Sequence, residues 1–189
     1  VSGLLAVMAE RGYEGATIVA IAKAAGLKSG LVHYHFENKR AILVALVERL
    51  VSVVERRYQT RLANGADSAA ARLDAWIDAQ LGLGPDGDLD AVAAWVFIGG
   101  ESIRQPEVRP IYEREMEARI SQVCDLVREV LVSEGRSSAQ AAELASLVVA
   151  AVEGAYHLGA TVPGALSRGF AAPYVQRAVH GLIAAEPKL

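Results

Sequence analysis

Apolar residues recur at intervals of three and four along most of the chain, the spacing that places side chains on one face of a helix. The pattern therefore predicts an all-α protein of about nine helices and no strands. We expect helices over residues 2–10, 17–24, 28–35, 38–62, a segment that Asp67 caps, 89–104, 107–133, 139–160 and 174–185. Loops are expected at LGLGPDGD (81–88) and TVPGALSRGFAAP (161–173), which are rich in Gly and Pro.

The segment 17–43 carries the clearest local signals. Thr17 and Asn38 have side chains that can cap helix N-termini. Gly26 suits a helix stop, because a left-handed residue costs least without a Cβ. Two short helices joined by such a turn form a helix-turn-helix, whose second helix enters the DNA major groove. We expect Leu31, Tyr34 and Phe36 to dock the second helix on the first.

Three pieces of this region, ERGYEGAT, IAKAAGLKSGLVHYHF and NKRAIL, resemble the DNA-binding domain of the TetR family of bacterial regulators. The match runs from about residue 10 to 43. The resemblance implies an N-terminal three-helix helix-turn-helix domain over 1–43, hereafter the head, with a long linking helix over 38–62. A C-terminal helical ligand-binding and dimerisation domain would follow over 44–189. It also implies a homodimeric repressor that a small-molecule inducer releases from a palindromic operator.

By the same resemblance, four head residues clamp the DNA backbone: Thr17, Tyr34, His35 and Lys39. The base readers should be Lys28, Ser29 and His33, with Gly30 allowing close approach and Val32 helping to pack the helix. The family often has Tyr in place of His33 and a small polar residue in place of Lys28. This departure indicates a distinct operator.

Helix 139–160 is apolar on more than one side, which indicates burial on several sides. Leu147 and Val148 lie on one side, while Val149 and Tyr156 lie on another. One side can face the protein's own core and the other a second copy of the chain. We therefore predict a homodimer through helices 139–160 and 174–185. The alternative is that both are ordinary core helices.

The C-terminal region resembles, more loosely, the TetR subgroup that includes betaine-pathway repressors, through WVFIGGESIRQPEVRPIY (95–112) and VVAAVEGAYHLG (148–159). An inducer would then fill a pocket among the central helices. The candidates are aromatic and polar residues within apolar helices: Trp76, Trp95, Phe97, Glu101, Tyr112, Met116, Glu153, Tyr156 and His157.

Buried carboxylates near aromatic rings can hold a cationic ligand by charge and cation–π contact. The alternative, which we favour for each carboxylate, is an internal pair, Glu101 with Arg104 or Glu153 with His157.

Charge is distributed unevenly along the chain. The net charge is −3, yet residues 1–61 hold nine Lys or Arg against five Asp or Glu, whereas 62–189 hold ten against seventeen. A basic N-terminal third on an acidic body is typical of a DNA-binding head on a regulatory domain. The single Cys124 excludes an internal disulfide, so we expect a reducing, cytoplasmic compartment.

Two other classes of protein fit the sequence less well. An enzyme is disfavoured, because the four histidines have no metal-ligand spacing and no nucleophile elbow or phosphate-binding glycine loop is present. No metal or cofactor is expected. A helical ligand-binding or protein-interaction module without DNA binding is disfavoured by the Thr17, Tyr34, His35 and Lys39 set. Because the chain starts at Val1 without Met, we expect residues to be missing before it.

Overall fold

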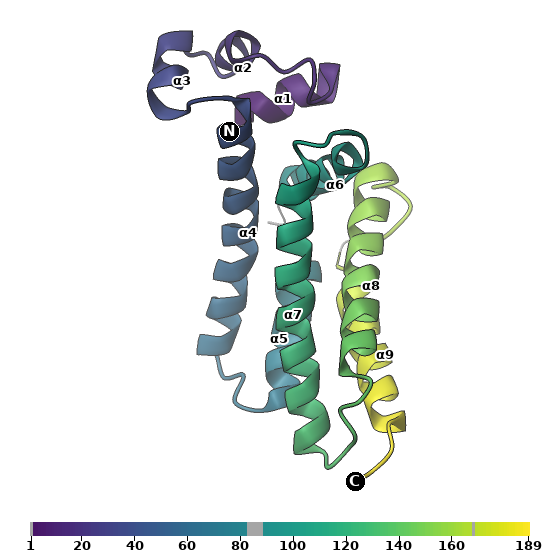
Figure 1. Cartoon of the computed structure of the whole chain (residues 1–189). Coiled ribbons are helices and arrows are strands. Elements are labelled where there is room, and N and C mark those ends of the chain that lie inside the picture. Colours follow the sequence, from purple (N-terminus) through teal and green to yellow (C-terminus); the bar gives the residue numbers. More distant parts are fainter. Residues whose placement is uncertain (1, 83–88, 168) are drawn as a thin grey trace. The chain divides into compact units, whose positions relative to one another are not determined.

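The computed structural model describes residues 2–82, 89–167 and 169–189. Within these ranges the regular secondary structure is helical, with one isolated β-bridge between Arg136 and Lys188, so the predicted all-α class is confirmed. The helices, labelled in Figure 1, are α1 Ser2–Arg11, α2 Ile18–Ala24, α3 Ser29–His35, α4 Lys39–Ala63, α5 Ala69–Leu81, α6 Leu89–Arg104, α7 Arg109–Ser133, α8 Ala141–Thr161 and α9 Ala171–Ala185. The predicted loop at 81–88 lies mostly outside the described residues.

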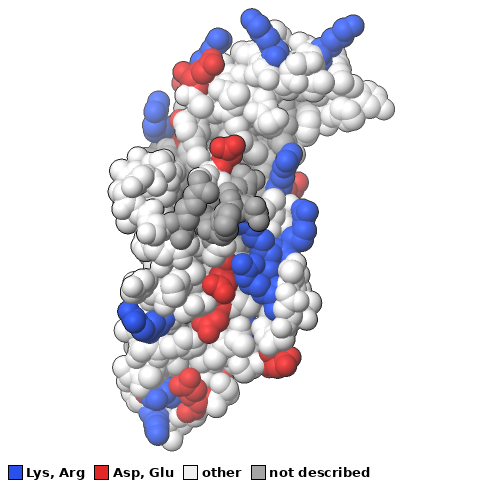
Figure 2. Space-filling view, turned by 180° about the vertical axis from the view of Figure 1, so that it is seen from behind, with Lys and Arg blue, Asp and Glu red and all other residues white. Residues whose placement is uncertain are grey.

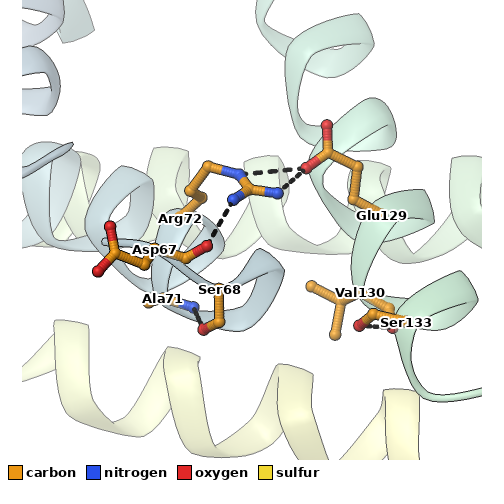
Figure 3. Close-up of polar contacts among 7 residues, drawn as sticks. All are labelled: Asp67, Ser68, Ala71, Arg72, Glu129, Val130 and Ser133. Atoms are coloured by element: carbon orange, nitrogen blue, oxygen red, sulfur yellow. Dashed lines mark hydrogen bonds and ion pairs between the residues drawn. The ribbon is translucent and has the colours of Figure 1, made fainter. Parts of the chain in front are cut away.

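The cap of α5 differs from the prediction. Ser68, not Asp67, caps this helix, because its hydroxyl accepts a 3.0 Å hydrogen bond from the amide of Ala71 (Figure 3). Arg72 donates to the backbone carbonyl of Asp67 and also pairs with Glu129 on α7 at 2.6 Å. The start of α5 is thus tied to α7.

Three other helix starts were misplaced. Helix α7 begins at Arg109 rather than 107, and α8 begins at Ala141 rather than 139, without a side-chain cap from the serines at 137–138. Helix α9 begins at Ala171 rather than 174. It includes Pro173, which the first turn of a helix tolerates because an amide there would have no helical partner.

Packing divides the chain into two compact units. The first, hereafter the head unit, comprises Val1–Ser52 and Ala94–Glu115. The second, hereafter the bundle unit, comprises Val53–Ala93 and Met116–Leu189. The head unit therefore joins α1–α3 and the start of α4 to most of α6 and the beginning of α7. The functional division into residues 1–43 and 44–189 stays a prediction.

The core of the head unit contains fully buried residues from several helices, among them Leu4, Met8, Ile42 and Leu46. Helices α1 and α2 approach very closely. A Cβ added at Gly3 would lie 2.5 Å from the backbone oxygen of Ile21, closer than any side chain can pack. Only glycine fits at this crossing, which fixes how α2 lies on α1.

In the bundle unit, α5 packs against both α8 and α9, and α8 packs against α9. Helix α8 buries Leu144, Val148, Val149 and Tyr156, so residues assigned from the sequence to two different sides share one buried face. Leu147, which we grouped with Val148, is exposed instead. The periodicity located the apolar residues but not the boundary between the two faces.

Helix α8 has the length and apolar composition of a membrane span. It is the one helix in the described ranges that is long and apolar enough, with a mean hydropathy of 1.3, to cross a membrane by length and composition alone. Of that stretch, 33% is buried within the protein. The core helix of a soluble domain meets the same criterion.

Candidate nucleic-acid interface

The helix-turn-helix forms through the predicted local contacts. The Thr17 hydroxyl accepts from the amide of Ala20 at 3.2 Å and caps α2. Gly26, with φ of +67°, ends that helix in the left-handed conformation. The Asn38 side chain accepts from the amide of Ala41 at 2.9 Å and caps α4. These three predictions are confirmed. Thr17 and Gly26 set the two ends of α2, and Asn38 caps α4, the helix that follows α3.

Docking of α3 depends on Val32, which we expected to help pack the helix, rather than on Leu31 and Tyr34. Val32 is the buried residue of this helix, together with Ile21 and Ala22 on α2. Leu31 is 46% exposed and Tyr34 is 82% exposed, so the prediction that they dock α3 was wrong. A helix of seven residues has two turns, and one buried side chain fixes it while most of its surface stays open.

That open surface carries most of the predicted DNA-binding residues. Lys28, Gly30, His33, Tyr34 and His35 are exposed, and Ser29 is partly exposed. The rings of Tyr34 and His35 meet edge to face with centroids 5.1 Å apart. Apart from its chain neighbours and the nearby backbone of its own helix, no described atom lies within 4 Å of a Cβ placed on Gly30, so packing does not require glycine there. Apart from Leu31, the exposed side chains of α3 carry hydrogen-bonding groups.

Lys39, the first residue of α4, is held by the turn that follows α1. Its ammonium donates to the backbone carbonyl of Tyr13 at 3.1 Å and to that of Glu14 at 3.5 Å. It also lies 4.4 Å from the centroid of the Tyr13 ring, within cation–π range. Sequence reasoning treated Lys39 as a DNA contact and missed these intramolecular partners.

Basic side chains of the head point outward. Arg11, Lys23, Lys28 and Arg40 are all exposed, and Figure 2 shows Lys and Arg side chains projecting at the top of the view, where the head is drawn. Both signs of charge share the rest of the face shown there. The uneven charge of the sequence is therefore displayed on the surface, where it can act on a polyanion.

The residues predicted to bind an inducer fall into both compact units. Trp95, Phe97, Glu101 and Tyr112 belong to the head unit, and the Trp95 and Tyr112 rings lie 5.1 Å apart. Trp76, Met116, Glu153, Tyr156 and His157 belong to the bundle unit. Trp76 is buried, with its indole donating to Gln122, whereas His157 is exposed.

The two candidate carboxylates have internal partners other than those predicted. Glu101 accepts from the amide of Tyr13 at 3.0 Å rather than pairing with Arg104. Glu153 pairs with Arg119 at 2.8 Å rather than with His157. Tyr156 donates to the side-chain oxygen of Gln80 at 2.7 Å, and burial raises the pKa of its hydroxyl to about 12. An internal role therefore accounts for each of these polar groups.

An apolar cavity of about 100 Å³ lies in the bundle unit. Its wall is largely aliphatic and aromatic, and of the predicted ligand residues only Tyr156 contributes to it. Other lining residues are Leu81, Leu89, Leu166 and Phe170. The sequence analysis missed Leu81 and Leu89 because it selected aromatic and polar residues within helices. It missed Leu166 and Phe170 because they come from the segment between α8 and α9.

Two short helices joined by a glycine turn, with a second helix exposed along a polar face, define a DNA-binding protein of the helix-turn-helix class. Residues 1–46 match the family model of the bacterial regulatory proteins of the tetR family, and residues 69–184 match that of the C-terminal region of BetI-type transcriptional repressors. The chain belongs to the TetR family, with a BetI-type C-terminal region. It is a ligand-responsive transcriptional regulator with a DNA-binding head, and its family is not one of enzymes.

Curated relatives agree with this assignment. The transcriptional regulator BetI of Serratia proteamaculans is 28% identical over 152 residues, which cover 78% of this chain and 74% of the relative. The regulator CymR of Pseudomonas putida is 29% identical over 157 residues, which cover 82% and 74%. Both are named as transcriptional regulators of the helix-turn-helix type.

Solved structures share the fold. A transcriptional regulator from Rhodococcus sp. Rha1 superposes with a TM-score of 0.75 at 19% identity, over 100% of this chain and 96% of that one. FadR from Bacillus subtilis in complex with stearoyl-CoA gives 0.71 at 16% identity, over 94% of each chain. A regulator from Saccharomonospora viridis in complex with choline gives 0.69 at 23% identity, over 97% and 95%.

Proposed function

We propose that this regulator binds a palindromic operator as a homodimer, with α3 of each copy in the major groove. The observation that carries the proposal is the exposed polar face of α3, a helix whose buried residue is Val32. A dimer with two-fold symmetry reads two half-sites about one helical turn, or a multiple of it, apart. Action on chromosomal DNA would place the protein in the bacterial cytoplasm.

In this proposal, phosphate contacts come from Thr17, Tyr34, His35 and Lys39. The exposure of the first three supports the role, because each hydroxyl or imidazole can reach a phosphate without leaving a buried partner. Lys39 has three donors and two backbone carbonyls as partners, so its ammonium keeps capacity for a further acceptor.

Base recognition is assigned to Lys28, Ser29 and His33, with Gly30 allowing the α3 backbone to approach the bases. Lys28 can donate to the acceptors of guanine, and His33 can donate to a base edge. The open surroundings of a Gly30 Cβ among the described residues support this assignment, since the space there is free for DNA rather than filled by the protein.

Dimerisation is assigned to the outer faces of α8 and α9. Leu147 and Leu158 on α8 and Tyr174 and Leu182 on α9 are large apolar residues that remain exposed in the single chain. A Cβ placed on the α8 glycine at 154 would meet nothing within 4 Å in the described part of the chain, so a second helix could approach closely there. Exposed apolar groups on two neighbouring helices favour a protein partner over solvent.

A small-molecule inducer would relieve repression by binding more tightly to the form that does not fit the operator. The nine predicted ligand residues stay candidates, but the internal partners of Glu101 and Glu153 weaken the case for a cationic ligand. The apolar cavity beside Tyr156 favours a compact apolar ligand group instead. Binding of choline that is unaffected by Glu153→Gln would remove the basis for a carboxylate cation site.

The test of DNA binding is a fluorescence anisotropy titration with DNA from upstream of the protein's own coding sequence, run at several salt concentrations. We expect specific binding with affinity that falls steeply as salt rises, because Lys and Arg contacts release counterions. A purified chain that is monomeric and binds this DNA no better than random DNA at low salt would overturn the proposal.

A further inference from the structure

A buried carboxylate on α6 reaches the turn that follows α1. Glu101 is 5% exposed, and its Oε2 accepts a hydrogen bond from the backbone amide of Tyr13 at 3.0 Å. The two residues are 88 positions apart in the sequence but belong to the same compact unit. A buried carboxylate is costly unless it is hydrogen-bonded, so this contact holds both groups in place.

Gly12 makes the contact possible. Its φ of +68° is a left-handed conformation that glycine adopts cheaply, and it turns the chain so that the next amide points at α6. Both carboxylate oxygens of Glu101 lie 3.8 Å from the position of a Cβ on Gly12. The turn is thus packed directly against the carboxylate.

Tyr13 also contacts Lys39, the first residue of α4. The residue is 1% exposed, its backbone carbonyl accepts from the Lys39 ammonium at 3.1 Å, and its ring lies under that ammonium. Its hydroxyl donates to Glu107 at 3.3 Å. Burial first, and then the charge of Glu107, raises the pKa of the Tyr13 hydroxyl, which therefore stays protonated and acts as a donor.

We propose that Glu101 is a positioning residue for DNA binding: its carboxylate fixes the Gly12–Tyr13 turn, and the turn fixes the direction of the Lys39 ammonium at the start of α4. This inference rests on the proposed phosphate contact of Lys39. Movement of α6 would withdraw the acceptor from the Tyr13 amide and release Lys39, so α6 and the DNA contact are coupled through one hydrogen bond.

The test compares four variants in the anisotropy titration across salt concentrations. Glu101→Leu removes the acceptor and should weaken operator binding about tenfold, the scale of one hydrogen bond to a charged group. It should also lower the salt slope by about one, as Lys39→Met does. Glu101→Gln keeps an oxygen acceptor of the same reach and should largely restore both values. Glu113→Leu removes an exposed carboxylate from the same unit and should change neither.

A double variant separates positioning from general damage. If Glu101 acts through Lys39, adding Glu101→Leu to Lys39→Met should weaken binding no further, because the group it positions is already absent. Additive losses, or a Glu101→Leu protein with unchanged affinity and salt slope, would overturn the inference.

The remaining outcomes distinguish a failure of the positioning role from a failure of the proposed function. Should Glu101→Leu fail to fold by circular dichroism, Glu101→Asp replaces it, since the shorter side chain keeps the charge but withdraws the acceptor, and the same losses are expected. Should the unaltered protein bind no operator DNA, the proposed function itself fails. Normal binding by the unaltered protein with no effect of the Glu101 variants overturns the positioning role alone.

Discussion

Two exposed helical surfaces of this chain differ in chemistry. The open face of α3 presents His33, Tyr34 and His35, all with hydrogen-bonding groups, beside the exposed Leu31, and Lys28 precedes the helix at its N-cap. The open faces of α8 and α9 present Leu147, Leu158, Tyr174 and Leu182, which are mostly apolar. Exposure alone therefore does not define function. Polar groups on a short, lightly anchored helix suit phosphates and base edges, whereas apolar groups on long, well-packed helices suit a second protein surface.

The largest expected effect comes from the apolar surface. The double substitution Leu147→Glu and Leu182→Glu should convert the dimer into a monomer, because four carboxylates would be buried in the symmetric interface. Operator affinity should then fall by about 100-fold or more, since the two heads no longer bind as one unit. Light scattering after size exclusion measures the mass.

The control for this prediction is Ser121→Glu, which adds a charge at an exposed position of α7. It should leave the mass and the operator affinity unchanged. A Leu147/Leu182 variant that keeps the dimer mass would place the interface elsewhere.

A second prediction concerns the polar surface. His33→Ala should lower affinity for the preferred operator by about 1–3 kcal/mol and change the base preferred at one position of each half-site, because it removes a donor to a base edge. Selection from a randomised half-site library reports the preference. Equal losses on operator and random DNA would instead assign His33 to phosphate contact.

A third prediction uses two tyrosines with opposite environments. Tyr156→Phe should lower the free energy of unfolding by about 1–3 kcal/mol, because it leaves the buried oxygens of Gln80 without their donor. Tyr34→Phe should leave stability unchanged, because this residue is almost fully exposed, and should weaken DNA binding instead. Urea denaturation and anisotropy titrations measure the two quantities. A stability loss in both variants would contradict the distinction between the buried Tyr156 and the exposed Tyr34.

The last prediction concerns the dependence of folding stability on pH. Burial raises the pKa of Tyr156 from 10.0 to about 12, so the folded protein holds this proton more tightly than the unfolded chain. Its contribution to stability is complete below pH 10 and is lost as the pH rises towards 12, by roughly 2–3 kcal/mol. Urea denaturation between about pH 8 and pH 11.5 should show a shallower decline for Tyr156→Phe than for the unaltered protein.

Local signals in the sequence predicted most helices and several of their ends. Thr17, Gly26 and Asn38 act where expected, because a cap or a left-handed turn depends on residues within four positions. Asp67 does not cap α5. By sequence, Asp67 and its neighbour Ser68 are equally good N-caps, and in the folded chain Ser68 occupies the N-cap position. The start of α9 was missed because Pro173 looked like a boundary although a first turn tolerates it.

The site was predicted unevenly for a related reason. The sequence identified the polar residues of α3, but it assigned docking to Leu31 and Tyr34 as well as to Val32, since a two-turn helix has too few positions for its periodicity to select a face. It proposed partners for Glu101 and Glu153 within four residues, the range that helical spacing can reveal. The actual partners, Tyr13 and Arg119, lie 88 and 34 positions away.

The sequence by itself determined the helical periodicity, the caps of the head and the separation of basic from acidic regions, because each of these depends on neighbours along the chain. Tertiary structure alone decided which face of α8 is buried, that Leu31 and Tyr34 stay exposed on α3, and that a carboxylate of α6 holds the turn beside Lys39. These features depend on contacts between distant segments, and only the packing of helices against one another selects among them.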